Sequence, residues 1–207
     1  MHSTLLLVRH GHTDWSRTRR VMGRRDLPLN EEGRAKGSAL AARFASLELA
    51  EVLSSPLVRS VETAEAIAAP HRIEVARDPR LTDVQAGPWE GRSIAEMSTS
   101  REYDAFLADP RALALPGAES LAAVRDRAVA SIGQALEDNP LGANVLVVTH
   151  ATVVRVLLAH YLGMNLAEHH RLRVAAGTFS VLRYQSDREL PRVLAINHGL
   201  DLDALLG

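Results

Sequence analysis

Runs of apolar residues alternate along the chain with longer segments in which apolar residues recur at helical spacing. Residues 5–8 and 145–148 are apolar at every position, which is typical of strands buried on both faces of a sheet. Helical segments separate the strands, and the first begins after Asn30, a favoured residue at the start of a helix. This alternation predicts an α/β protein: a three-layer sandwich with a mostly parallel central sheet and helices on both faces.

The same pattern gives approximate bounds for the elements. Strands are expected at residues 4–8, 51–54, 72–76, 145–148, 178–184 and 192–197, the last two as a hairpin. Helices are expected at residues 31–47, 57–68, 93–108, 118–138 and 151–162, and residues 9–30 are expected to form a loop.

One segment, residues 93–120, interrupts the alternation of strands and helices. It predicts a small helical cap inserted over one edge of the sheet. No internal repeat or low-complexity linker divides the chain, so residues 1–207 are expected to form a single domain.

Composition narrows the functional classes. The net charge of −1 gives no general attraction to nucleic acid or to a membrane surface, and we expect neither as a partner. No apolar stretch approaches the roughly 20 residues that span a bilayer, and the N-terminus lacks the pattern of a signal peptide, so a cytoplasmic location is expected. Cysteine is absent, which excludes a cysteine nucleophile and thiolate metal ligands. A homodimer is left open.

Reactive side chains follow the two fully apolar strands directly. Arg9, His10 and Gly11 follow the first strand, and Thr149 and His150 follow the second. Ligands of open α/β sheets bind at the carboxyl ends of the strands, so both imidazoles are expected at one crevice. A guanidinium group suits a cluster of anionic oxygens, and an imidazole acts as nucleophile or base near neutral pH. This predicts an anion site with a reactive histidine.

Further cationic features point to phosphate as the anion. Arg59 follows the expected strand 51–54, and the helix that begins near Ala151 directs free backbone N–H groups toward the same edge. Residues 9–25 contain six arginines and one acidic residue.

Six short segments match, in order, the motifs of one known family. They are Leu7 to Trp15, Asp26 to Asn30 with Gly33, Ser54 to Ala64, Gly87 to Gly91, Pro116 to Ser120, and Val147 to His150. With these motifs, which include the Arg-His-Gly signature at residues 9–11, the chain resembles the histidine phosphatase superfamily, also called the phosphoglycerate-mutase-like family.

The resemblance implies a role for each matched residue. His10 would attack phosphorus and form a phosphohistidine, while Arg9, Arg59 and His150 would hold the phosphoryl oxygens. A carboxylic acid would protonate the leaving group and then activate water. Thr13, Ser16 and Ala151 are also expected to contact the substrate. Neither a cofactor nor a metal ion is implied.

Three positions depart from the family pattern. His12 stands where Glu or Gln is usual, and Ser16 where Asn is common. Asp83 occupies the region of the usual general-acid Glu, one methylene shorter, and is our expected acid, with Glu90 as the second candidate. A metal site at His10 and His12 is disfavoured because no third ligand with recognisable spacing accompanies them.

The function expected from these residues is that of a metal-independent phosphomonoesterase acting on a small organic phosphate. A cofactor-dependent phosphoglycerate mutase is the alternative hypothesis, and a non-catalytic phosphate-binding module is the third. Mutases must keep water from the phosphoenzyme, and those of this family carry a longer insertion than the segment 93–120. The short insertion favours the phosphatase.

Overall fold

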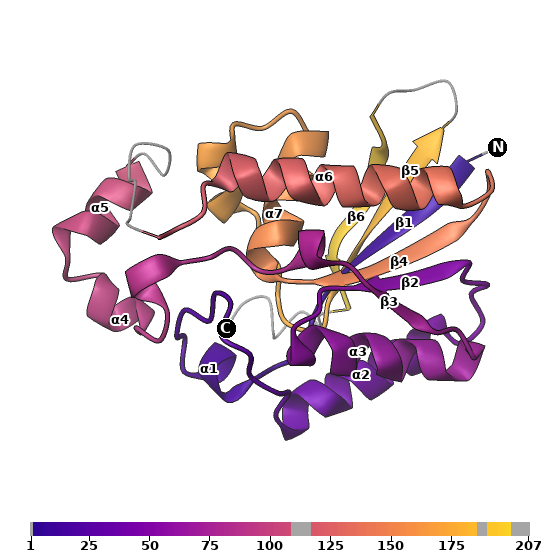
Figure 1. The fold of residues 1–207 in the computed structure, drawn as a ribbon, viewed down its shortest axis with the longest axis horizontal. Helices are drawn as coiled ribbons and strands as arrows, with labels where there is room; N and C mark the ends of the chain where they lie inside the picture. The colour runs from indigo at the N-terminus through magenta and orange to yellow at the C-terminus, as the bar shows by residue number, and fades with distance from the viewer. Residues whose placement is uncertain (1, 109–116, 186–189, 200–207) are drawn as a thin grey trace.

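The computed structural model describes residues 2–108, 117–185 and 190–199. It contains a six-stranded sheet in the order β3-β2-β4-β1-β5-β6 (Figure 1). The strands are β1 (His2–Arg9), β2 (Glu51–Ser54), β3 (Val75–Arg77), β4 (Asn144–Thr149), β5 (Phe179–Gln185) and β6 (Arg192–His198). The first four strands are mutually parallel, β5 pairs antiparallel with β1, and β6 pairs antiparallel with β5 at the edge of the sheet. The prediction of a mostly parallel sheet is therefore confirmed.

Strand β1 is apolar at consecutive positions because both of its faces are covered. Leu5 and Leu7 pack into one core cluster, whereas Leu6 and Val8 pack into another on the opposite face. Successive side chains of a strand point to opposite faces, so an uninterrupted apolar run fills both cores.

Two pairs of long helices cover the two faces of the sheet (Figure 1). Helices α2 (Glu31–Phe44) and α3 (Val58–Ala68) lie on one face, and α6 (Leu121–Asp138) and α7 (Ala151–Tyr161) on the other. This arrangement confirms the three-layer sandwich. Asn30 caps α2 as expected, because its side chain accepts a hydrogen bond from the backbone N–H of Gly33.

Short helices complete the described chain. They are α1 (Asp14–Arg17), η1 (Ala69–His71), η2 (Pro79–Leu81), η3 (Gly87–Trp89), α4 (Ile94–Met97), α5 (Arg101–Ala108) and η4 (Leu166–Arg171). Of the described helices, none is both long and apolar enough to cross a membrane.

Four expected bounds are wrong, each for a local reason. The helix expected at 31–47 ends at Phe44, where the backbone N–H of Leu47 donates to the Phe44 carbonyl at 2.8 Å and closes a turn. The segment 9–30 is not a continuous loop, because a reciprocal capping box between Thr13 and Ser16 closes the single turn of α1. The helix expected at 118–138 begins only after Ser120, whose hydroxyl caps it. The strand expected at 72–76 begins at Val75, because Arg72 adopts a left-handed conformation with φ of 58°.

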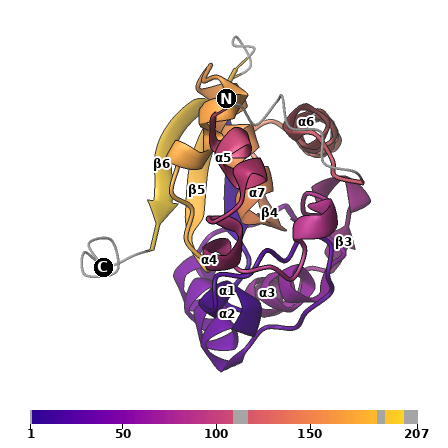
Figure 2. The ribbon, with the colours of Figure 1, turned by 90° about the vertical axis from the view of Figure 1, so that its left-hand side faces the viewer.

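The cap segment also differs from the single helix expected at 93–108. It forms two short helices, α4 and α5, because α4 ends at Met97 and serine and threonine residues follow. Both helices lie beyond the carboxyl ends of the parallel strands, and Figure 2, which looks from that side, shows them in front of the sheet. Cap residues 109–116 and the expected hairpin turn at 186–189 lie outside the described residues.

Candidate active site

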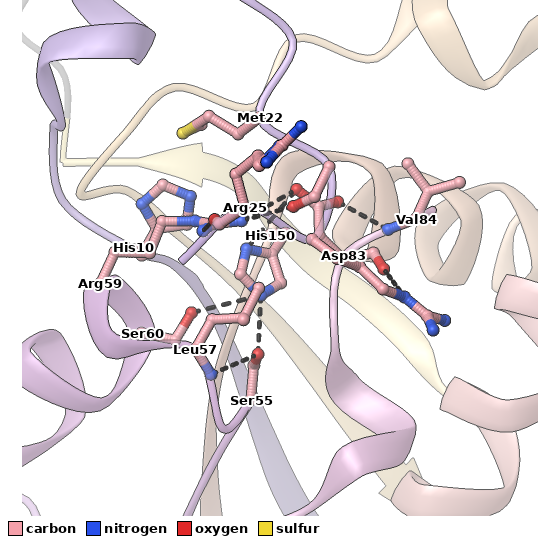
Figure 3. Close-up of polar contacts among 12 residues, drawn as sticks. His10, Met22, Arg25, Ser55, Leu57, Arg59, Ser60, Asp83, Val84 and His150 are labelled. Carbon is pink, nitrogen blue, oxygen red and sulfur yellow. Dashed lines mark hydrogen bonds and ion pairs between the residues drawn. The ribbon is translucent and has the colours of Figure 1, made fainter. Parts of the chain in front are cut away.

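His10 and His150 meet because their strands are neighbours. β1 and β4 pair in parallel with Arg9 opposite Thr149, and the backbone N–H of His10 donates to the Thr149 carbonyl at 3.0 Å. Both side chains are buried, and their ring centroids lie 5.2 Å apart. The two imidazoles share one site at the carboxyl edge of the sheet, as the sequence predicts (Figure 3).

The contacts of His10 leave one ring nitrogen available. Its Nδ1 lies 2.7 Å from the carbonyl oxygen of Gly11, so Nδ1 carries the hydrogen and donates it. Nε2 is buried and has no hydrogen-bond partner within the described residues. Burial, reinforced by the positive charges of Arg59 and Arg9, holds the pKa of His10 well below its ordinary value. His10 is therefore a neutral imidazole with a free lone pair on Nε2.

Arg59 lies in the first turn of α3 and is fully buried. Its guanidinium group donates to the carbonyls of Arg25 at 2.7 Å and Gly23 at 2.9 Å, and to the carboxylate of Asp83 at 3.3 Å. The loop before α2 thus orients this cation beside the two histidines.

Arg9 is held by the segment that precedes β5. Its Nη1 donates to the Val174 carbonyl at 2.7 Å, and its backbone N–H donates to the Thr178 carbonyl at 3.0 Å. The N–H of Gly177 lies 3.1 Å from the carbonyls of both Arg9 and His10. Burial, with the charge of Arg155 on α7, lowers the pKa of Arg9 to about 10. Arg9 therefore stays protonated at neutral pH.

Four buried nitrogen atoms of these residues have no hydrogen-bond partner in the described part of the chain. They are Nε of Arg9, Nε2 of His10, Nε of Arg59 and Nδ1 of His150. A buried polar group without a partner costs roughly 1–3 kcal/mol, so such groups concentrated in one place point to a ligand. An anion is the ligand that two guanidinium groups and two imidazoles suit.

Asp83 brings a carboxyl group to the same site. One oxygen, Oδ2, lies 3.3 Å from Nη2 of Arg59 and 3.7 Å from Nδ1 of His150, and Oδ1 accepts the backbone N–H of Val84 at 2.9 Å (Figure 3). Burial raises the pKa of Asp83, and this effect outweighs the opposing attraction of Arg59. The carboxyl group therefore retains a proton more readily than an exposed aspartic acid.

Glu90, the second candidate acid, faces elsewhere. Its Oε1 accepts the backbone N–H groups of Arg24 at 3.1 Å and Ala86 at 3.3 Å, and its other oxygen lies 3.6 Å from Nε of Arg25. Glu90 joins two loops, and Asp83 is the carboxyl group that the fold brings to the imidazoles.

The side chains of Thr13 and Ser16 each bond to the backbone of the other residue. The Thr13 hydroxyl accepts the N–H of Ser16 at 3.1 Å and lies 3.2 Å from Sδ of Met22, while the Ser16 hydroxyl lies 2.9 Å from the Thr13 carbonyl and 3.1 Å from Nδ1 of His12. Their contacts with a substrate stay predictions, as does that of Ala151, the first residue of α7.

Sequence reasoning missed the clamp that holds the Asp83 backbone. Arg24 and Arg127 both donate to the Asp83 carbonyl at 3.3 Å, and both pair with Glu119, at 3.2 Å and 2.7 Å respectively. Glu119 belongs to a recognised motif, but nothing local in the sequence indicates that its partners come from the loop 18–30 and from α6.

A mostly parallel sandwich with buried histidines after two adjacent central strands, a buried Arg59 and a partly buried Arg9 beside them, has the arrangement of the histidine phosphatase class of α/β protein. The family model of the histidine phosphatase superfamily (branch 1) matches residues 5–198, and the chain belongs to this superfamily.

Known relatives carry both mutase and phosphatase names. The probable phosphoglycerate mutase GpmB of Proteus mirabilis is 34% identical over 182 residues, which cover 87% of this chain and 84% of the relative. YhfR of Bacillus stearothermophilus has a similar structure, with a TM-score of 0.86, 29% identity and coverage of 96% and 98% of the two chains. The α-ribazole phosphatase of Shigella flexneri shares the fold, with a TM-score of 0.82, 24% identity and coverage of 96% and 99%.

Proposed function

We propose that the protein is a phosphomonoesterase that hydrolyses a small organic phosphate through a phosphohistidine on Nε2 of His10. The observation that carries this proposal is the unpartnered, neutral Nε2 of His10, which shares a buried site with two arginines, a second histidine and a carboxyl group of raised pKa. These are a nucleophile, a cationic clamp and an acid, the parts that phosphoryl transfer requires.

In the first step, the lone pair of His10 Nε2 attacks phosphorus, and the bond between phosphorus and the ester oxygen breaks. Asp83 gives its proton to that oxygen, so the leaving group departs as a neutral alcohol. Arg9, Arg59 and His150 stabilise the negative charge on the phosphoryl oxygens.

In the second step, water attacks the phosphohistidine. The Asp83 carboxylate takes a proton from the water, the bond between phosphorus and Nε2 breaks, and inorganic phosphate leaves. Asp83 is then protonated again and His10 is free, so both groups return to their starting states.

A phosphoglycerate mutase is the second candidate, because curated relatives carry that name. A mutase would pass the phosphoryl group from His10 to a hydroxyl group of its substrate instead of to water. The short insertion at residues 93–120, of which α4 and α5 are the described helices, supports access of water and therefore the phosphatase.

The two activities are distinguished by following substrate and inorganic phosphate together. A panel of phosphomonoesters that includes 3-phosphoglycerate is assayed with and without a 2,3-bisphosphoglycerate primer and with and without EDTA, using His10→Ala as the blank. We expect phosphate release equal to substrate loss, no effect of the primer and full activity in EDTA.

Each other outcome rejects part of the proposal. Primer-dependent interconversion of phosphoglycerates without phosphate release would identify a mutase. Phosphate binding without turnover of any ester would identify a binding module. Loss of activity in EDTA, restored by one metal ion, would mean that a metal assists the arginines.

A further inference from the structure

A serine side chain contacts the imidazole of His150 at the ring nitrogen that faces away from the candidate site. Its Nε2 lies 2.7 Å from the hydroxyl oxygen of Ser55, in the turn between β2 and α3, and 3.4 Å from that of Ser60 on α3. Nδ1, on the opposite side of the ring, is directed toward Asp83 and the guanidinium group of Arg59 (Figure 3). One nitrogen of His150 thus contacts the protein scaffold and the other faces the candidate site.

The hydrogen-bond partners of Ser55 determine the direction of this short contact. The Ser55 oxygen accepts the backbone N–H of Leu57 at 3.3 Å, and its own hydroxyl hydrogen needs an acceptor because the side chain is fully buried. Within the described residues, Nε2 of His150 is the one acceptor in reach of that hydrogen. If Nε2 instead carried a hydrogen and donated it, the Ser55 hydroxyl hydrogen would be buried without a partner, which is costly.

Only a neutral imidazole has two alternative tautomers. Burial and the positive charges of Arg59 and Arg9 keep the pKa of His150 well below its ordinary value, so the ring carries a single hydrogen at neutral pH. If Nε2 accepts from Ser55, that hydrogen is on Nδ1.

We propose that Ser55 is a positioning residue that fixes the tautomer of His150, so that Nδ1–H is presented as a donor to the phosphoryl oxygens. This inference rests on the proposed function for its catalytic meaning, although the tautomer itself does not depend on it. Without the serine, the neutral ring is free to place its lone pair on Nδ1, where it would repel an anionic oxygen instead of donating to it.

The tautomer is measured directly by long-range ¹H–¹⁵N correlation spectra of protein labelled at histidine, with His150→Asn used to assign the signals. We expect the wild-type protein to show His150 as the Nδ1–H tautomer, and Ser55→Ala to shift it toward Nε2–H. His10, whose Nδ1 is fixed by the Gly11 carbonyl, serves as the internal reference and stays Nδ1–H in both proteins.

Kinetics test the consequence for catalysis. We expect Ser55→Ala to lower kcat by about 10- to 100-fold with less than about a threefold change in KM, since loss of one oriented donor typically costs about 10²–10³-fold and a mixed tautomer retains part of it. The matched control is Ser54→Ala, which removes a fully buried neighbouring hydroxyl that bonds to the Ser55 carbonyl and does not contact His150. It should keep the Nδ1–H tautomer.

Several results would overturn the inference. A wild-type His150 in the Nε2–H form would do so without any variant, as would an unchanged tautomer in folded Ser55→Ala. If Ser60→Ala shifts the tautomer and Ser55→Ala does not, the longer contact is the one that matters. A protein that shows the expected tautomers but hydrolyses no ester would reject the proposed function and leave the Ser55 contact in place.

Discussion

At the scale of single residues, the Gly11 carbonyl occupies Nδ1 of His10 and so leaves Nε2 free for the proposed nucleophilic attack. We expect His10→Ala to lower turnover by at least about 10³-fold, since the proposed covalent step then has no attacking atom. Phosphoenzyme trapped from the wild-type protein should be labile in acid and stable in alkali, as a phosphoramidate is. Near-UV circular dichroism checks that the variant is folded. A folded variant with retained turnover, or an acid-stable phosphoenzyme, would reject the mechanism.

Asp83 should matter most when the leaving group is poor. We expect Asp83→Asn to slow hydrolysis of alkyl phosphates by about 10²–10⁴-fold, the usual contribution of a general acid, and that of p-nitrophenyl phosphate far less, because nitrophenolate leaves without a proton. Glu90→Gln is the matched control, since it changes the other candidate carboxylate. Equal losses on both substrates would remove Asp83 from the role of acid.

The raised pKa of Asp83 also predicts a pH dependence for alkyl phosphates. The acid form donates the proton, so kcat should fall as the pH rises through the pKa of Asp83 in the complex. Asp83→Asn should abolish this decline. A decline that persists in the variant would assign it to another group.

At the scale of secondary-structure elements, the sequence predicts best what depends on local pattern. The buried strands β1 and β4 are visible as uninterrupted apolar runs, and their pairing brings His10 and His150 together. Helix α1 was missed because a single turn closed by one capping box has no apolar periodicity to detect. The split of the cap into α4 and α5 was missed for a similar reason, because short polar breaks carry little periodic signal.

In the candidate site, too, features that depend on local pattern could be predicted and features that depend on tertiary contacts could not. Arg59 could be expected near the histidines from the strand that it follows, and Asp83 from the family motifs. The residues that orient them could not, because their contacts are tertiary: Arg127 reaches the Asp83 carbonyl from α6, and Gly177 reaches the carbonyls of Arg9 and His10. Such contacts depend on three-dimensional packing and leave no pattern along the chain.

Strand β6 influences this site through Asn197. Its side-chain oxygen accepts the backbone N–H of Ala175 at 2.7 Å and lies 2.8 Å from the Thr178 hydroxyl, so it holds the segment that contains Gly177. Its φ is 58°, a conformation that glycine also adopts readily. We expect Asn197→Gly, which keeps this conformation and loses the acceptor, to reduce kcat/KM by about tenfold through misplacement of Arg9 and His10.

Asn197→Asp is the matched control variant, because it retains the side-chain oxygen that accepts these hydrogen bonds. It should stay within about threefold of the wild-type kcat/KM, and vanadate inhibition should weaken in the glycine variant and not in the aspartate variant. If the glycine variant is fully active, the backbone conformation alone accounts for this residue.

At the scale of the whole molecule, the buried histidines make stability depend on pH. The pKa values of His10 and His150 are lowered in the folded protein, so below about pH 6.5 the unfolded chain binds protons that the folded protein does not. The free energy of unfolding should therefore fall with falling pH, by up to about 1.4 kcal/mol per pH unit for each histidine.

Urea unfolding at several pH values between 5 and 7.5, compared with the double variant His10→Gln/His150→Gln, measures this contribution. The variant should show a shallower dependence on pH. His169, whose pKa is lowered to about 4, is present in both proteins and cancels in the comparison. Identical slopes would show that the two imidazoles bind protons equally in the folded and unfolded states.

The central place of β1 has a consequence for biosynthesis. Strand β1 lies between β4 and β5, and both of these neighbours come after residue 143 in the sequence. During translation, the apolar segment 5–8 therefore emerges long before either partner strand exists, and pairing it with β4 requires closure of the chain between residues 9 and 144. Until then the nascent chain must keep this segment from aggregating, and His10 at its end takes its place only after β4 and β5 have been made.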